Sequence, residues 1–175
     1  MGSLFRRMVG AAKLQVATYE EVEADRKATA QALFIVLLSA VAIMIGDIRP
    51  GEVHLIVNLV GGVLGWMTWV LLVWVVGVKL LPEAETRSDV GELIRTTGFA
   101  ATPGILRVLG IVPMLGWLVV VVAWLWTLAA MVVGVRQALD YKSTWRAVAV
   151  CVIGFVGQLL VIYLEWIVLQ SALST

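Results

Sequence analysis

The chain has 175 residues, of which 61% are hydrophobic and 14% charged, and its formal net charge is +1. Soluble domains are about 45–50% apolar and about 25% charged, and a soluble chain of this length cannot hide so much apolar surface. The composition also excludes a disordered chain, and the single cysteine, Cys151, excludes a disulfide scaffold. The near-neutral charge argues against a nucleic-acid partner. We therefore expect an integral membrane protein.

Residues 1–27 form a charged N-terminal segment ahead of the first long apolar run. Residues 4–16 within it have helical periodicity, with apolar side chains on one side of a helical wheel and Arg6 and Lys13 opposite. This pattern is typical of an amphipathic helix that lies flat on a membrane, where anionic lipid attracts basic side chains. We expect Arg6, Arg7 and Lys13 to meet the cytoplasmic membrane surface.

Four stretches without Asp, Glu, Lys or Arg follow, at residues 28–46, 53–78, 108–135 and 147–164. Each meets or nearly meets the roughly 20 apolar residues that cross a bilayer core of about 30 Å. The apolar residues run continuously instead of alternating, which excludes the strands of a membrane barrel. The sequence therefore predicts four membrane-spanning helices.

A fifth span is predicted over residues 96–112, which contain Arg107 and, near their middle, Pro103 and Gly104. Hydropathy alone leaves an interfacial or re-entrant segment open. Charge placement favours a span, because lysine and arginine concentrate in cytoplasmic loops. Five spans put 11 of the 13 basic residues on one side, whereas four spans put nine there.

The predicted fold is thus an all-α, polytopic transmembrane bundle of five spans with an N-terminal interfacial helix. The bundle occupies residues 28–173, the N-terminus is cytoplasmic, the C-terminus is external, and the location is the cytoplasmic (plasma) membrane. The approximate spans are residues 28–46, 54–78, 96–112, 116–135 and 147–169.

Local motifs predict how the third span begins and ends. Asp89 and Glu92 have the spacing of a capping box, so a helix is expected to start there outside the membrane. The helix is then expected to bend at Pro103 and Gly104. An apolar corner from Pro113 to Gly116 is expected to turn the chain into the fourth span, since proline fixes φ and glycine relieves the steric limit.

Two ionisable residues lie within predicted spans, Arg107 in the third and Glu165 in the fifth. At about 1.5 Å per residue both fall in the external half of the membrane, so a charged pair is geometrically open. Such a pair serves either a relay or substrate site, or the joining of two helices. We favour the structural pair, because a relay needs several titratable groups in series and the outer side adds only Asp47, Glu52 and His54.

Glycines in the second and fifth spans have the spacing of close helix contacts. Gly61 and Gly65 are four residues apart, which is the small-xxx-small pattern, and Gly154 and Gly157 offer a similar surface. The pattern leaves open whether the contacts lie within one bundle or between copies.

No catalytic residue, metal site or cofactor is predicted. One histidine and one cysteine cannot supply the ligand sets that zinc or copper requires. His54 and Cys151 are also expected near opposite faces of the membrane, which excludes a Cys-His pair. The expected partners are membrane lipids, together with other membrane proteins or further copies of the chain.

Residues 98–154 combine a helix broken at Pro103, the apolar corner and a fourth span that ends in GVRQA. The loop YKST then leads into Arg146 and Ala147, and the sequence YEEVEAD precedes the first span. In these features the chain resembles the Yip1 family of integral membrane proteins, in particular its prokaryotic members, over about residues 14–165. The resemblance implies a five-span bundle with a cytoplasmic N-terminus that organises membrane or scaffolds partners.

Three functions follow from these observations. The first is a non-enzymatic membrane protein that binds partners or lipids, as the short loops and small-residue surfaces indicate. The second is a small transporter or channel that uses Arg107 and Glu165. The third is an accessory subunit of a larger membrane complex.

Overall fold

The structure, a computed structural model, describes residues 2–46 and 55–173, and every regular element in these ranges is helical. Four helical stretches are long and apolar enough to cross a membrane: Ala28–Gly46, Leu59–Leu80, Gly116–Ala138 and Thr144–Ile167. The elements in chain order are α1 (Gly2–Ala12), α2 (Val16–Ala24), α3 (Ala28–Gly46), α4 (Leu55–Trp74), η1 (Val75–Leu80), α5 (Val90–Ala100), η2 (Thr102–Ile111), α6 (Gly116–Ala138) and α7 (Thr144–Leu173).

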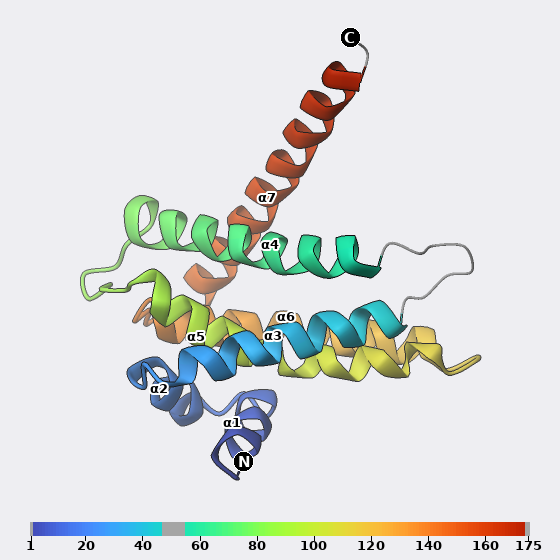
Figure 1. The fold of residues 1–175 in the computed structure, drawn as a ribbon. Coiled ribbons are helices and arrows are strands. Elements are labelled where there is room, and N and C mark those ends of the chain that lie inside the picture. The colour runs from blue at the N-terminus through green and yellow to red at the C-terminus, as the bar shows by residue number, and fades with distance from the viewer. Residues whose placement is uncertain (1, 47–54, 174–175) are drawn as a thin grey trace.

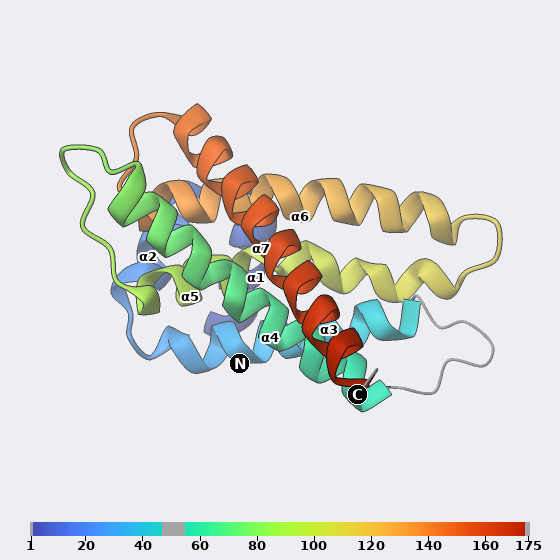
Figure 2. The same cartoon turned by 90° about the horizontal axis from the view of Figure 1, so that it is seen from above.

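The helices form two crossed layers. In one layer α5 and η2 run between α3 and α6, and these pairs make the most extensive contacts of the fold (Figures 1 and 2). Helix α4 lies on this layer, and α7 packs on α4 and α6 before its C-terminal part leaves the bundle (Figure 1). The short helices α1 and α2 cover the opposite side of the layer, against α5 and α6.

The segment predicted as the third span is not one continuous α-helix. It begins as predicted, because the Asp89 carboxylate accepts a hydrogen bond from Glu92 N–H at 2.8 Å and the Glu92 carboxylate accepts one from Asp89 N–H at 3.0 Å. The α-helix ends at Ala100, and residues Thr102–Ile111 form a 3₁₀ helix, η2. Pro103 lies in its first turn, where the missing N–H removes an i→i−4 hydrogen bond. Five α-helical spans are therefore not seen; the described helices that qualify number four.

The predicted amphipathic helix over residues 4–16 is also shorter than expected. Helix α1 ends at Ala12, because Leu14 adopts a left-handed conformation with φ of 58°. The N–H of Gln15 donates to the carbonyl of Gly10 and that of Leu14 to the carbonyl of Ala11, which is the Schellman pattern of a helix end. The chain thus turns and starts α2 at Val16.

Two buried apolar clusters hold the fold together. The first joins α1, α2, α3 and α5 around Tyr19, Ile35 and Phe99. The second joins α4, η1, α5, α6 and the start of α7 around Leu93 and Leu139. Helix α5 contributes to both clusters, so its position fixes the two layers relative to each other.

Candidate functional site

A π-helical turn sets the position of the loop that follows α4. The turn, η1, leaves carbonyl groups without their usual α-helical partners. The hydroxyl of Tyr141, a residue that is 3% exposed, lies 3.0 Å from the carbonyl oxygen of Gly77 and 2.6 Å from that of Leu81. Tyr141 comes from the loop between α6 and α7, so this single side chain ties the two loops together.

The α6–α7 loop is shaped by a second left-handed residue. Asp140 has φ of 53°, the N–H of Tyr141 donates to the carbonyl of Arg136, and that of Asp140 donates to the carbonyl of Gln137. This Schellman pattern ends α6 and turns the chain sharply. The Arg136 side chain reinforces the turn, because its Nε donates to the carbonyl oxygen of Tyr141 at 3.2 Å.

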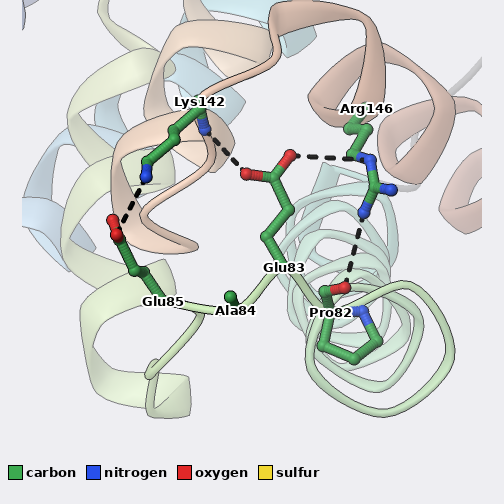
Figure 3. Close-up of a pocket in the computed structure, with 6 residues that line it drawn as sticks. All are labelled: Pro82, Glu83, Ala84, Glu85, Lys142 and Arg146. Atoms are coloured by element: carbon green, nitrogen blue, oxygen red, sulfur yellow. Dashed lines mark hydrogen bonds and ion pairs between the residues drawn. The ribbon is translucent and has the colours of Figure 1, made fainter.

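The two loops enclose an open pocket of about 350 Å³, which we call the loop pocket (Figure 3). Glu83 connects its two walls: its carboxylate accepts a hydrogen bond from the backbone N–H of Lys142 at 3.0 Å and lies 3.5 Å from Nε of Arg146. The pocket is lined by Pro82, Glu83, Ala84, Glu85, Lys142 and Arg146. Two carboxylates and two cations therefore share one hollow.

The charged groups of the loop pocket differ in how firmly they are held. The Glu83 side chain is 16% exposed and braces both walls. By contrast, Lys142 Nζ and Glu85 Oε1 pair at 2.8 Å with their side chains 74% and 64% exposed. The contacts of Arg146 with its described neighbours are long: Nη1 lies 3.4 Å from the Pro82 carbonyl oxygen and Nε lies 3.5 Å from the Glu83 carboxylate. Exposed ion pairs contribute little to stability, so Lys142, Glu85 and Arg146 are available to exchange partners.

A buried arginine organises the N-terminal helices. Arg7 is 8% exposed, and its guanidinium donates to Glu21 at 2.9 Å, to Asp25 at 2.8 Å and to the Gln31 side chain at 3.0 Å. These bonds join α1 to α2 and to the first turn of α3. Arg6 adds a two-point pair with Glu21 at 2.7 and 2.9 Å. Hydrogen bonds from the two arginines lower the pKa of Glu21 to about 2.

A second group of charges lies between α2 and the start of α5. Arg95 is 6% exposed, and its Nε donates to the carbonyl oxygen of Glu23 at 2.8 Å. Burial raises the pKa of the Glu23 carboxyl to about 7, and the nearby carboxylates Asp140, Glu92 and Glu20 act in the same direction. Glu23 therefore changes charge close to neutral pH.

The structure does not bring Arg107 and Glu165 together. Arg107 lies in η2, which packs between α3 and α6, whereas Glu165 lies in the exposed C-terminal part of α7. The additional candidates Asp47, Glu52 and His54 lie outside the described residues.

The predicted packing glycines differ in what surrounds them. A Cβ at Gly61 would meet nothing within 4 Å, so this glycine makes no close contact with the part of the bundle that the structure describes. A Cβ at Gly65 would lie 3.1 Å from Gln158 Nε2, and one at Gly154 would lie 2.9 Å from Val73 Cγ2. A Cβ at Gly157 would have ordinary contact with a leucine of α4. Gly65, Gly154 and Gly157 therefore lie where α4 and α7 cross.

Close helix packing also occurs along α3, where the sequence did not single out the contacts of Ala32 and Gly46. A Cβ at Gly98 would lie 2.7 Å from Ala32 Cβ, and one at Gly104 would overlap the Ser39 hydroxyl. Further along α3, a Cβ at Gly46 would overlap the backbone carbonyl of Arg107 in η2. We call Ala32, Ser39 and Gly46 the α3 ladder. Their spacing of seven residues is the one signal that would have found it, because residues seven apart share a helix face.

The corner between η2 and α6 is also built on backbone contact. Met114 has φ of 66°, and the N–H of Gly116 donates to the carbonyl of Val112 at 2.8 Å. A Cβ at Gly116 would overlap the backbone of Gly110. Pro113 and Gly116 thus stand at the predicted corner, and glycine is required at position 116 because two segments of the backbone approach each other closely there.

The chemistry of these sites is that of binding and packing. No group of three or more His, Cys, Asp or Glu residues in the described chain has the arrangement of a metal site. The charged groups gather in the loop pocket and around the N-terminal helices, where they join helices and loops.

Comparison with known proteins gives a family. A family model described as the Yip1 domain matches residues 15–164. In the same comparisons no curated protein and no solved structure matches the chain. The matched range begins after α1, ends within α7 and includes the α3 ladder and the loop pocket.

Proposed function

Because the chain belongs to the Yip1 family of non-enzymatic integral membrane proteins, we propose that it organises membrane or scaffolds partner proteins. The proposed contact surface is the C-terminal part of α7, within the membrane. The proposal extends the family assignment to a specific surface of this chain.

One observation carries the proposal: α7 is exposed on every side near its end. The consecutive residues Ile162–Ile167 are all exposed, and six residues exceed one helical turn of about 3.6. Figure 1 shows this part of α7 rising away from the other helices. Glu165 lies on the same stretch, and a carboxylate facing hydrocarbon is costly. A partner that offers a polar group to Glu165 lowers this cost.

We propose that α5 and η2 together form a fifth span. A 3₁₀ helix rises about 2.0 Å per residue and an α-helix about 1.5 Å, so the two segments cover roughly 36 Å, more than a bilayer core of about 30 Å. The segment also runs between two candidate spans, α3 and α6, along their length. This side-by-side packing supports a segment that crosses the membrane, and not one that lies at the membrane surface.

The proposed orientation has the N-terminus in the cytoplasm, the C-terminus outside and the chain in the plasma membrane. It is supported by the placement of 11 of 13 basic residues on one side of a five-span chain. On the same side we propose that α1 touches lipid through Phe5, which is 69% exposed, and through Lys13. Arg6 and Arg7 contribute less to this surface, since they are engaged by Glu21 and Asp25.

Photo-crosslinking in native membranes tests the proposal. A crosslinking amino acid in place of Tyr163, which is 57% exposed, is expected to give adducts with a discrete protein. The matched control is the same amino acid in place of Val150, which is fully buried on the same helix. Adducts of equal yield at both positions, or lipid adducts alone at Tyr163, would contradict a partner-binding role for α7. The mass of the adduct separates a second copy from a subunit of a larger complex.

The exposed end of α7 equally favours the role of accessory subunit in a larger complex. In that role the chain co-elutes with the other subunits in fixed ratio during mild-detergent purification, whereas a scaffold exchanges its partners. Flux of ions, protons or lipid in reconstituted vesicles that Glu165→Gln abolishes would instead favour a transporter.

A further inference from the structure

We propose that the loop pocket binds the headgroup of a zwitterionic phospholipid that carries a phosphate and a primary ammonium. This inference does not depend on the partner-binding role of α7. It begins from the charges of the pocket, which come in both signs: Glu83 and Glu85 from one loop, Lys142 and Arg146 from the other (Figure 3). A purely anionic ligand would be repelled by the two carboxylates, and a purely cationic ligand by the two cations.

The groups that would contact a headgroup are the loosely held ones. Glu83 is 16% exposed and is occupied with joining the walls of the pocket, so it is a positioning residue. Glu85 and Lys142, 64% and 74% exposed, hold only each other. A ligand that brings its own ammonium and phosphate can replace each partner of this pair, so that no charge is left alone: the ammonium pairs with Glu85 and the phosphate with Lys142.

The phosphate has two further sources of attraction. Arg146 is half exposed, and its guanidinium lies 3.4 Å from the Pro82 carbonyl oxygen and 3.5 Å from the Glu83 carboxylate. These contacts are long, so the guanidinium retains donors for a phosphate. Helix α7 begins at Thr144, between Lys142 and Arg146 in the chain. The positive end of a helix favours an anion, and here it lies among two cationic side chains that line the same cavity.

The surroundings of the pocket point to a lipid and not to a soluble molecule. Trp145, next to Arg146, is 82% exposed, and Leu80, two residues before Pro82, is 65% exposed. Tryptophan concentrates at the level of lipid headgroups, with its ring between water and hydrocarbon. Exposed apolar side chains on both loops therefore flank the charged hollow, as the glycerol and acyl chains of a bound lipid require.

Native mass spectrometry of the delipidated full chain in detergent tests the assignment. Phosphatidylethanolamine, phosphatidylglycerol and phosphatidylcholine with identical acyl chains are titrated in turn. Phosphatidylethanolamine is expected to bind best, because it alone has both a phosphate and an ammonium with hydrogen-bond donors. Arg146→Gln is expected to reduce its binding about tenfold or more, because the variant loses a charge-assisted hydrogen-bond donor to the phosphate. Glu85→Gln is expected to abolish the preference over phosphatidylcholine.

Controls make the result decisive. Arg26→Gln removes an exposed cation outside the pocket and is expected to leave binding unchanged. Arg146→Lys keeps the charge, so partial recovery of binding separates loss of a contact from loss of fold. Preference for phosphatidylglycerol, or equal binding of all three lipids, would overturn the proposal. So would equal affinity for water-soluble glycerophosphoethanolamine, because that result would assign the pocket to a soluble ligand.

Discussion

Gly98 of α5 lies directly against Ala32 of α3: a Cβ on the glycine would stand 2.7 Å from the alanine Cβ and 3.1 Å from its Cα. Neither residue leaves room for a larger neighbour, and both are fully buried or nearly so. The contact is the first level of the α3 ladder, which brings the backbones of α3 and the α5–η2 segment together. Small residues permit such approach where lipid gives no hydrophobic driving force between helices.

Substitution at this contact is expected to destabilise the bundle. Gly98→Val forces α3 and α5 apart, and overpacking of this kind costs about 1–3 kcal/mol. Gly61→Val is the matched control, because a Cβ there meets nothing within 4 Å. Thermal unfolding in detergent, followed by circular dichroism, measures both variants. Equal midpoints for the two would show that the α3 ladder is not a tight contact. If Gly61→Val leaves stability intact but lowers crosslinking to partners, Gly61 belongs to an intermolecular surface.

Arg7→Ala is expected to release α1 from the bundle. The substitution removes the donor that Glu21, Asp25 and Gln31 share, and hydrogen bonds to charged groups are worth about 1.5–3 kcal/mol each. Limited proteolysis after Lys13 should accelerate by about tenfold or more. Arg6→Ala provides the control, since the Arg6 side chain is 63% exposed and its pair with Glu21 is screened by solvent. Equal proteolysis of the two variants would contradict the central place of Arg7.

The docking of α2 is expected to weaken as the pH rises. Glu23 has a pKa of about 7 in the folded protein, against 4.5 for an ordinary glutamate, because burial disfavours its charged form. A raised carboxyl pKa stabilises the fold below about pH 4.5, and this contribution is lost as the pH rises through 7. The unfolding midpoint should therefore be lower at pH 8 than at pH 5.5, with a smaller difference in Glu23→Gln. The nearby carboxylates Asp140, Glu92 and Glu20 also raise the pKa of Glu23, whereas the charge of Arg95 lowers it.

Glu21 gives the opposite sign and serves as the internal comparison. Its pKa is lowered to about 2 by the hydrogen bonds from Arg6 and Arg7, so its contribution is present above pH 4.5 and is lost as the pH falls toward 2. Glu21→Gln should change acid stability and leave the difference between pH 5.5 and pH 8 in place. If Glu21→Gln removes the difference between pH 5.5 and pH 8 and Glu23→Gln does not, the pH dependence comes from Glu21 and not from Glu23.

Tyr141→Phe is expected to loosen both loops. The variant leaves the carbonyl groups of Gly77 and Leu81 without the buried hydroxyl, at a cost of about 1–3 kcal/mol. Hydrogen exchange should rise in η1 and in the α6–α7 loop together, because one side chain joins them. Tyr163→Phe, at a position 57% exposed on α7, is the matched control and should exchange like the wild type. Increased exchange in only one loop would show that the tyrosine does not couple them.

The parts of the fold that depend on local chemistry were predictable from the sequence. Helix α3 coincides with the predicted range 28–46 because charged residues flank an uninterrupted apolar run. The start of α5 was predictable from the capping-box residues Asp89 and Glu92, which form reciprocal hydrogen bonds within one turn. In both cases the determining residues are neighbours in the chain.

The remaining features depend on partners distant in the chain. Pro103 signalled an interruption, but the continuation as a 3₁₀ helix is set by packing between α3 and α6. The pattern of Gly61 and Gly65 was visible, yet which glycine is touched depends on how helices cross. The loop pocket joins residues about 60 positions apart, such as Glu83 and Lys142, and no local pattern brings them together.

The π-helical turn η1 has a consequence for insertions and deletions. A π-helix closes its hydrogen bonds between residues five apart, so it holds one residue more than an α-helical turn. Deleting one residue between Val75 and Val78 would let the turn revert to α geometry. The side chains of Lys79 and Leu80 would stay on the same face of the helix. The same deletion within α6 would rotate everything beyond it by about 100° around the helix axis. Among relatives, length changes inside the second span are therefore expected to concentrate in this one turn.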